Sequence, residues 1–492
     1  MSVRVRDAVR DVRCKSVATG LYSACDDVAF GRTSRHATCS GRRTVPLCTI
    51  RDGFRRDQTG AIVKSDCCNE EELNGLQWAS LEYYIRELNY RNGLIADKTQ
   101  PGAPASIAAV GMAMATLPIL AAREHLPRRL LARRLLSRLR FLWQSPHGPD
   151  PDATGYRGFF YHFLDMETGR RAGRCELSTV DTAFLMAGVL AAATYFDQDT
   201  EDEHEIRTLA ESLYRRVDWR WALNGGATLT HGWTPETGFL PYRWEGYDES
   251  LLLYVLALGS PTCPVPEECY PAWTSTYRWR EVYGYEYLYA GPLFIHQMSH
   301  LWIDFRGIQD AFMRERRIDY FENSRRATFV HQQYAIRNPL QFEGYGERCW
   351  GITASDGPGW VVRTVNGVER RFFDYTARGA PDGPDDGTLA PWAVVASLPF
   401  APEIVLPTIK RFDEMDLGMI EPYGFKATFN PTFPVEGSDH GWVSPWHIGV
   451  DQGPIIIAIE NYRTGLLWQL MRRCPYIVAG LRRAGFTNGW LS

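Results

Sequence analysis

Apolar residues recur at helical spacing along most of the chain after residue 70. This pattern predicts helices within the segments 71–88, 128–144, 181–196, 249–259, 296–305 and 453–471. The alternation of apolar and polar residues that is typical of strands is rare. The intervening segments are rich in Gly, Pro and aromatic residues, which favours long loops over tight turns. We therefore expect an all-α protein with long loops.

Two of the predicted helices are apolar on nearly every face. Residues 181–196 carry no charge after the first position. Residues 455–470 carry only Glu460 and Arg463. A surface helix has a polar face, so these two helices are expected to be enclosed by others, as in a double-layered helical toroid. No spacer divides residues 71–492, which predicts a single catalytic-size domain.

Residues 1–70 differ from the rest of the chain. They are rich in Arg, Ser, Thr and Gly, have little apolar periodicity and contain six of the eleven cysteines. This composition predicts a poorly ordered N-terminal extension, because it offers little apolar surface to bury. The first residues are positively charged but no apolar segment follows them, so a secretory signal is not predicted. We expect a cytoplasmic protein, or a periplasmic one if the N-terminal extension is not the true start of the chain.

Composition and charge exclude several classes of protein. The balance of 54 basic and 58 acidic residues, with a net charge of −4, gives no electrostatic reason to expect nucleic-acid binding. The longest apolar segment, 106–122, is short for a transmembrane helix and contains Ser, Thr, Gly and Pro. The cysteines form no CxxC pair, and His296 and His300 have no evident third ligand, so neither a metal nor a cofactor is expected. The sequence indicates no oligomeric state.

Three acids precede the apolar segment 251–259, namely Glu245, Asp248 and Glu249. Capping and the helix dipole favour acids at a helix N-terminus by ~0.3–1 kcal/mol each, which would account for one of them. Glu249 lies nearest to the predicted helix. It is therefore the first candidate for a chemical role.

The arrangement of aromatic loop, acid and apolar helix recurs along the chain. Glu176 and Asp181 accompany one inner-type helix, and Asp451 precedes another. Gly- and aromatic-rich loops supply further candidates, namely Glu343, Glu347, Asp356 and Trp350. Loops at one end of an inner helical layer would bring these acids together. Acids in such a cleft can also be purely structural.

Facing carboxylates lined by aromatic rings are what glycoside cleavage requires. One acid protonates the leaving oxygen, and a second carboxylate activates water or attacks the anomeric carbon. Trp244 and Tyr247 flank the acids near Glu249 and can raise its pKa by removing water from around it. The expected partner is an oligosaccharide or polysaccharide substrate.

Six segments carry a family resemblance, namely 106–119, 176–190, 246–262, 291–310, 350–358 and 451–468. Through them the chain, from about residue 76 to 491, resembles the bacterial glucoamylase-like (glycoamylase) domain family. That family includes endo-β-1,2-glucanases of glycoside hydrolase family 144 and relatives in cyclic β-1,2-glucan synthases. Cys263 and Pro264 depart from the family, which more often has His after the preceding segment.

The resemblance implies an (α/α)6 toroid with long loops at the active-site end, and hydrolysis of a β-glucan, most plausibly β-1,2-linked. It implies Glu249 as the general acid and Asp451 as the general base that acts on water. In the related synthases configuration is retained, so Glu343 or Glu347 is the alternative partner of Glu249. A carboxyl separation of roughly 5 Å predicts retention and roughly 6.5–9.5 Å predicts inversion. The expected substrate-binding residues are Glu176, Asp181, Trp244, Tyr247, Glu343, Trp350 and Asp356.

Two other functions stay open at this point. A transglycosylase acting on the same linkage would give larger or cyclic products. A non-catalytic glucan-binding protein on the same fold would bind without turnover. The acids at both main positions, Glu249 and Asp451, argue for an enzyme.

Overall fold

A computed structural model describes residues 55–56, 62–63, 67–417 and 422–492. The extension predicted for residues 1–70 lies almost entirely outside the described residues. Its described parts include the antiparallel pair of β1 (Arg55–Arg56) and β2 (Ile62–Val63). The first helix, α1, begins at Glu70 with Asn69 as its N-cap. The division of the chain at residue 70 stays a prediction.

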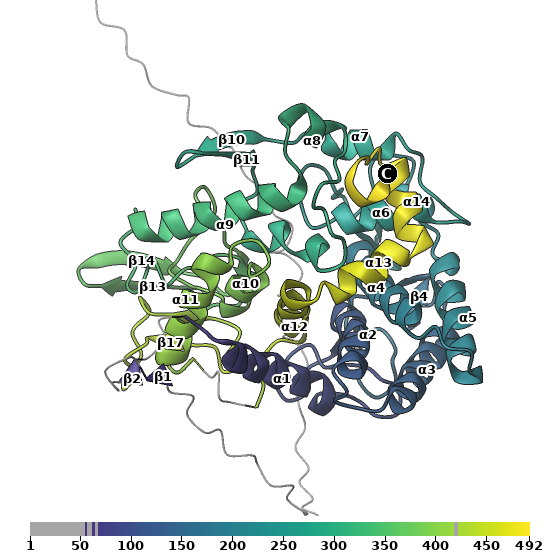
Figure 1. Ribbon diagram of the computed structural model, residues 1–492, viewed down its shortest axis with the longest axis horizontal. Coiled ribbons are helices and arrows are strands. Elements are labelled where there is room, and N and C mark those ends of the chain that lie inside the picture. Colours follow the sequence, from purple (N-terminus) through teal and green to yellow (C-terminus); the bar gives the residue numbers. More distant parts are fainter. Residues whose placement is uncertain (1–54, 57–61, 64–66, 418–421) are drawn as a thin grey trace, which may run out of the picture.

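The protein is mostly helical, and its long helices form an inner and an outer layer (Figure 1). The inner helices are α2 (Ile107–Ala122), α4 (Thr179–Tyr195), α6 (Leu251–Gly259), α10 (Pro391–Ala396) and α12 (Gly449–Arg463). The outer helices are α1 (Glu70–Arg86), α3 (Arg128–Gln144), α5 (Glu201–Arg216), α9 (Tyr320–Arg337) and α11 (Pro402–Glu414). The remaining helices are α7 (Cys269–Thr274), α8 (Ala311–Arg316), α13 (Leu466–Arg473) and α14 (Pro475–Arg483).

The inner helices pack in a ring that α12 closes. α12 contacts α2 and α10, α2 contacts α4, and α4 contacts α6. In Figure 1, α12 lies between the half of the molecule that contains α2 and α4 and the half that contains α10 and α11. α12 also joins two hydrophobic cores, because Ile456 and Ile457 belong to one and Ile455 and Ile459 to the other. This is the (α/α)6 architecture predicted from the sequence.

One inner position is occupied by two short 3-10 helices instead of an α-helix. These are η4 (Leu293–His296) and η5 (Met298–Leu301). The helix predicted over 296–305 is therefore wrong beyond residue 301. The buried Gln297 between the two turns donates hydrogen bonds to the Ala393 carbonyl and the Ser397 hydroxyl of the α10 region, at 2.6 and 2.7 Å. A 3-10 helix is also present at Trp221–Leu223 and at Gly489–Leu491.

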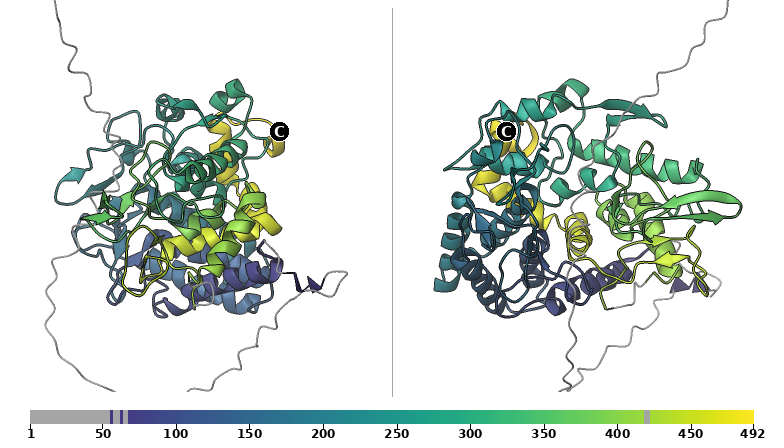
Figure 2. Two further views of the ribbon diagram at one scale, coloured as in Figure 1. Left: turned by 90° about the vertical axis from the view of Figure 1, so that its left-hand side faces the viewer. Right: turned by 180° about the vertical axis from the view of Figure 1, so that it is seen from behind.

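Short antiparallel strands occupy the loops and lead into several inner helices. Ala105–Ser106 (β3) precedes α2 and pairs with Phe163–Leu164 (β6), while Leu177–Ser178 (β7) precedes α4. The others are β4 (Gly155–Tyr156), β5 (Phe159–Phe160), β8 (Gly232–Thr234), β9 (Gly238–Phe239), β10 (Trp279–Val282), β11 (Tyr285–Leu288), β12 (Ala354–Ser355), β13 (Val361–Val365), β14 (Val368–Phe372), β15 (Thr376–Ala377), β16 (Phe429–Asn430) and β17 (Trp442–Val443). The hairpin of β13 and β14 extends from the edge of the molecule opposite α3 and α5 (Figure 2).

None of the described helices is both long enough and apolar enough to cross a lipid bilayer. The all-round apolar surface of α2 and α4 is instead covered by protein. Every residue of α2 from Ile107 to Leu120 is buried, which agrees with the inner position predicted for such helices.

Two glycines allow α2 and α4 to approach closely. A Cβ atom added at Gly188 of α4 would lie 1.9 Å from the carbonyl oxygen of Gly111 in α2. A Cβ added at Gly111 would lie 2.5 Å from the carbonyl oxygen of Phe184. Both obstacles are backbone atoms, which cannot move aside as a flexible side chain can. The spacing between these two inner helices thus depends on both glycines.

We expect Gly188→Ala to lower the free energy of unfolding by roughly 1–3 kcal/mol or more, because the new methyl group forces α2 and α4 apart. Gly75 of α1 is the matched control, since it is an exposed helical glycine with no atom within 4 Å of an added Cβ. Gly75→Ala should stabilise the protein by roughly 0.5–1 kcal/mol. Denaturant unfolding measures both changes. Equal effects of the two substitutions would contradict the close-packing argument.

Candidate active site

The three acids before α6 have different surroundings. Glu245 is exposed and accepts a hydrogen bond from the Thr228 hydroxyl at 2.9 Å. Asp248 lies two residues before Ser250, the N-cap of α6, and accepts from the Ser250 backbone N–H at 3.0 Å and from the indole N–H of Trp273 at 3.3 Å. Glu249 is half-buried and has neither of these partners. Asp248 therefore stabilises the turn that leads into α6, whereas Glu249 does not.

The environment of Glu249 favours its protonated form. Burial, and after it the negative charges of Asp248 and Asp181, raise the pKa of Glu249 to about 8. Burial also raises the pKa of the adjacent Asp248, to about 7, so the ionisation of each acid depends on the other. Its backbone is fixed against η5, where the Ser299 hydroxyl lies 3.1 Å from the Leu252 backbone nitrogen and 3.5 Å from the Glu249 carbonyl. At neutral pH this carboxyl group can therefore donate a proton from a fixed position.

Asp181, in the first turn of α4, and Glu176, just before β7, meet at His162. His162 Nδ1 lies 2.9 Å from a Glu176 oxygen, and its Nε2 lies 3.6 Å from an oxygen of Asp181. Burial by itself would lower the pKa of His162, but the charges of Asp181 and Glu176 outweigh burial and raise it to about 10. Burial also opposes the charged form of Glu176, yet the nearby imidazolium lowers the pKa of that carboxyl overall. A buried ion pair thus fixes this side of the site.

Asp451 lies in the first turn of α12, next to Asp97, Lys98 and Asp356. Lys98 Nζ is 3.7 Å from a carboxylate oxygen of Asp356. Burial, followed by the charges of Asp356 and Asp97, raises the pKa of Asp451 well above its ordinary value, while Lys98 acts in the opposite direction. Burial likewise raises the pKa of Asp97 to about 6, although Lys98 and His162 both lower it.

Tyr375 joins the two sides of the site. Burial, and then the charges of Asp356, Glu249, Asp451 and Asp181, raise the pKa of its hydroxyl. Four carboxylates from separate parts of the chain therefore lie around one phenol ring. We call the five interacting acids Asp97, Asp181, Glu249, Asp356 and Asp451 the carboxylate cluster.

The carboxylate cluster holds more negative than positive charge. Among the residues that the structure describes, the cations that act on it include Lys98, His162 and Arg378, of which His162 is also paired with Glu176 and Arg378 with Asp386. Five acids near three cations, two of which are paired with other acids, cannot all be ionised at low energetic cost in a buried site. A proton donor and a proton acceptor can therefore exist there together at neutral pH, which is the requirement for acid/base cleavage of a glycosidic bond.

His162, Glu176 and Asp181 also have the composition of a metal site, because their ligand atoms lie within 4.8 Å of one another. A metal ion needs a neutral imidazole nitrogen as its ligand. The raised pKa of His162, about 10, means that its ring carries a positive charge at neutral pH. These three residues form an ion-paired triad.

The structure brings Glu249, Asp181, Asp356 and Asp451 together, with Glu176 beside them, as the sequence predicts. Trp244 and Tyr247, which the sequence analysis predicts to bind the substrate, pack against other side chains instead. Trp244 is buried, donates to the Thr179 hydroxyl at 3.0 Å and stacks on His231 at 3.7 Å. Tyr247 is half-buried and packs against Tyr277, His296 and Tyr320. Both rings therefore support the loop that carries Glu249 and the start of α4.

Trp350 and Glu343 form their hydrogen bonds outside the carboxylate cluster, although the sequence analysis predicts both as substrate-binding residues. Trp350 has an exposed fraction of 0% and donates to Thr408 of α11 at 2.9 Å, so its ring has no face open to a sugar. Glu343 is exposed and accepts a hydrogen bond from Asn366, in the turn between β13 and β14, at 2.6 Å. Glu347 is also exposed. Neither glutamate is among the charges that act on Glu249.

The sequence reasoning missed Asp97, Lys98, His162 and Tyr375. Lys98 and Asp97 follow α1 in a polar loop, and His162 lies between two short strands. None of them precedes an apolar helix, which was the signal that identified the other acids. The remaining sequence signal for these four residues is that polar residues cluster in the loops next to the predicted inner helices.

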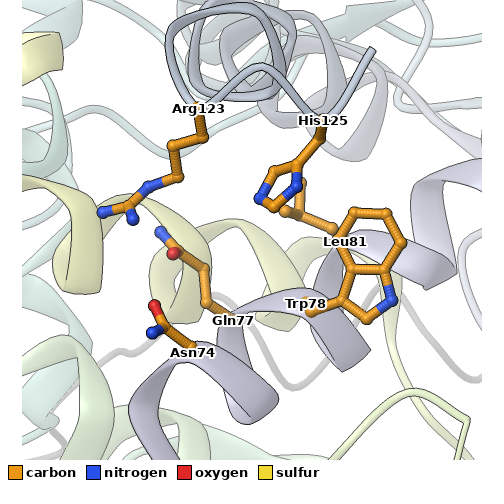
Figure 3. A pocket seen from close by; sticks show the side chains of 6 residues that line it. All are labelled: Asn74, Gln77, Trp78, Leu81, Arg123 and His125. Atoms are coloured by element: carbon orange, nitrogen blue, oxygen red, sulfur yellow. The ribbon is translucent and has the colours of Figure 1, made fainter. Parts of the chain in front are cut away.

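A separate hollow lies at the other end of α2 (Figure 3). It has a volume of about 400 Å³ and is lined by Asn74, Gln77, Trp78, Leu81, Arg123 and His125. Arg123 follows the C-terminal end of α2, and its side chain is paired with the buried Glu460 at 2.7 Å. The carboxylate cluster adjoins the start of α2, roughly 24 Å away at 1.5 Å per helical residue. The hollow is therefore distinct from the candidate active site.

Comparison with known proteins identifies the family. The glycoamylase family model, described as "Putative glucoamylase", matches residues 241–475, which include both Glu249 and Asp451. A solved structure from Bacteroides uniformis with the same description is 31% identical, covers 88% of this chain and 100% of its own, and superposes with a TM-score of 0.76. The chain belongs to the glycoamylase family.

Two further relatives of this glycoamylase-family chain have more specific descriptions. An endo-β-1,2-glucanase from Chitinophaga pinensis, solved with sophorotriose and glucose, is 25% identical, with a TM-score of 0.75, and the match covers 87% of this chain and all of that one. An exo-β-1,2-glucooligosaccharide sophorohydrolase (non-reducing end) from Parabacteroides distasonis is 28% identical over 462 residues. That match covers 87% of this chain but only 59% of the relative's length.

We expect His162→Gln to destabilise the fold by about 3–5 kcal/mol near pH 6, because it leaves the buried Glu176 and the half-buried Asp181 without their cation. The pKa of His162 is raised to about 10 from 6.5, so its charge adds stability that is fully present below pH 6.5 and is lost as the pH rises through about 10. The difference in melting temperature between wild type and variant should therefore shrink from pH 6 to pH 10. The exposed His204 of α5 provides the control substitution. A constant difference across this range would contradict the ion pair.

Proposed function

We propose that the protein is a glycoside hydrolase that cleaves β-1,2-linked glucan, with Glu249 as general acid and Asp451 as general base. The observation that carries the proposal is the position of Glu249, a carboxyl group with a pKa of about 8 within a cluster that also contains Asp451. The printed activities of the Chitinophaga pinensis and Parabacteroides distasonis relatives support β-1,2-glucan as the substrate. The cytoplasmic location expected from the sequence stays a prediction.

In the proposed reaction Glu249 donates its proton to the glycosidic oxygen as the bond to the anomeric carbon breaks. A carboxylic acid with an ordinary pKa would be ionised at neutral pH and would have no proton to give. Burial and the adjacent Asp248 remove this difficulty by favouring the protonated form. After cleavage Glu249 is left ionised and takes up a proton from solvent.

Asp451 accepts a proton from the water that attacks the anomeric carbon. Glu249 and Asp451 lie at the start of different inner helices, α6 and α12, and both charges act on Tyr375. Two acids from different helices near one tyrosine support a substrate that lies between them. Asp181, Asp356 and Glu176 are then available to accept hydrogen bonds from sugar hydroxyls.

We expect Glu249→Gln to lower kcat on linear β-1,2-glucan by about 10²- to 10⁴-fold, because glutamine has no proton to donate. Binding of the glucan, measured by titration calorimetry, should persist, since the amide keeps the shape of the carboxyl group. Linear and cyclic β-1,2-glucan, laminarin and starch form the substrate panel, with products and anomers followed over time. Activity on starch alone would contradict the proposed linkage.

Three substitutions complete this experiment. Asp451→Asn should also strongly lower hydrolysis, whereas Glu343→Gln and Glu347→Gln should retain it, because both glutamates are exposed and neither is among the charges that act on Glu249. Larger or cyclic products from the wild-type protein would favour the transglycosylase. Binding without turnover by any preparation would favour the non-catalytic alternative. Near-full activity of the Glu249 variant would end its assignment as the acid.

Asp248→Asn should move the alkaline limb of the pH–activity profile to lower pH. Glu249 must be protonated to act, so kcat/KM falls as the pH rises through its pKa of about 8. Removing the charge of Asp248 lowers that pKa and brings the fall to a lower pH. Glu245→Gln is the control, because Glu245 is exposed and bonded to Thr228. An unmoved limb in the Asp248 variant would show that burial alone sets the proton affinity.

A further inference from the structure

Lys98 is attached to the start of α12 through its backbone. Residues 97–99 run antiparallel to residues 447–449, with Lys98 opposite Ile448. The Gly449 N–H donates to the Asp97 carbonyl at 2.6 Å, and the Thr99 N–H donates to the His447 carbonyl at 3.0 Å. The loop after α1 therefore cannot move without moving the first turn of α12.

The first turn of α12 is also fixed from α1. The Tyr84 hydroxyl donates to the Gly449 carbonyl at 2.8 Å. A Cβ atom at Gly449 would lie 2.7 Å from the Ala96 carbonyl oxygen, so the two backbones approach as closely as a glycine allows. Ile448, the N-cap residue, offers no side-chain cap of its own. These contacts fix Lys98 and Asp451 relative to each other.

The charged groups around Asp451 differ in sign. Asp356, which follows β12, and Asp97, on the loop after α1, both repel a charge on Asp451. Tyr84 of α1 and Tyr375 also face it, and both are neutral phenols. Lys98 is the one positive group that acts on Asp451 within the described part of the chain, and its ammonium group lies 3.7 Å from Asp356.

A general base has to be ionised before it can accept a proton. Burial and two neighbouring carboxylates oppose ionisation of Asp451, and an opposite charge is the physical means of offsetting them. We propose that Lys98 is a positioning residue that favours the ionised form of Asp451, which its role as the base requires, and that holds Asp356 beside it. This inference rests on the proposed function of Asp451.

The main test compares Lys98→Met with Lys98→Arg in pH profiles of kcat/KM on linear β-1,2-glucan. Loss of the positive charge should move the acid limb, which reports ionisation of Asp451, upward by about one pH unit. At a pH below the acid limb, kcat/KM of Lys98→Met should be about tenfold lower than that of the wild type. Lys98→Arg should have a kcat/KM close to the wild-type value. The alkaline limb should not move, because the charges that act on Glu249 are those of Asp248 and Asp181.

Lys410→Met is the matched control. Lys410 of α11 forms an ion pair with Glu72 and has a side-chain exposure of 18%, against 21% for Lys98. Its loss should reduce stability without moving either limb. An equal loss of kcat/KM at every pH in Lys98→Met, with both limbs unmoved, would overturn the proposal, because it would indicate a structural or direct substrate contact.

Thermal unfolding tests Lys98 without any assay of activity. With Lys98 absent, Asp97, Asp356 and Asp451 repel one another only when ionised, so Lys98→Met should lower the melting temperature more at pH 8 than at pH 5. Adding Asp356→Asn should recover part of the loss at pH 8. If the wild type cleaves no glucan, the proposed function is contradicted. The melting temperatures at pH 5 and pH 8 would still show whether Lys98 offsets the charges of the neighbouring acids. A loss that is independent of pH, or unaffected by Asp356→Asn, would overturn that role.

Discussion

The close packing of apolar inner helices is the constraint on which the rest of this structure depends. α2 and α4 meet through Gly111 and Gly188 with no space for a Cβ atom, and their side chains are buried on all faces. Polar groups cannot be placed along such helices without a large desolvation cost. They can be placed at the helix ends, where loops and free backbone N–H groups are available. Chemistry in this fold is therefore concentrated at the ends of the inner layer.

The N-terminal ends of the inner helices collect acids in particular. Asp181 lies in the first turn of α4, Glu249 just before α6 and Asp451 in the first turn of α12. The helix dipole favours a negative charge at each of these positions, but burial and neighbouring acids nevertheless raise the pKa of Glu249 and of Asp451. This excess of acids is a cost to stability that makes a shared proton available in the site. His162 and Lys98 limit the cost without cancelling it.

The sequence predicted the parts of the site that depend on local pattern. An acid directly before or at the start of an apolar helix is visible in the sequence, and Asp181, Glu249 and Asp451 were found in this way. Lys98 could not be found, because its proximity to Asp451 depends on backbone pairing between residues 97–99 and 447–449, which are far apart in the chain. Trp350 was misplaced for the opposite reason. A Gly- and aromatic-rich segment is the same pattern whether its tryptophan faces a cleft or, as here, the core beside α11.

The two proposed catalytic acids show why sequence position alone does not determine a role. Glu249 and Asp451 both adjoin the N-terminus of an inner helix, and burial raises the pKa of both. Asp248 and Asp181 add repulsion at Glu249, and Asp356 and Asp97 add repulsion at Asp451, but Asp451 also has Lys98, a cation that opposes this repulsion. Two carboxyl groups in similar helical positions thus differ in whether a neighbouring positive charge favours the ionised form. An acid/base pair requires this asymmetry, since one member must keep its proton at the pH where the other has lost it.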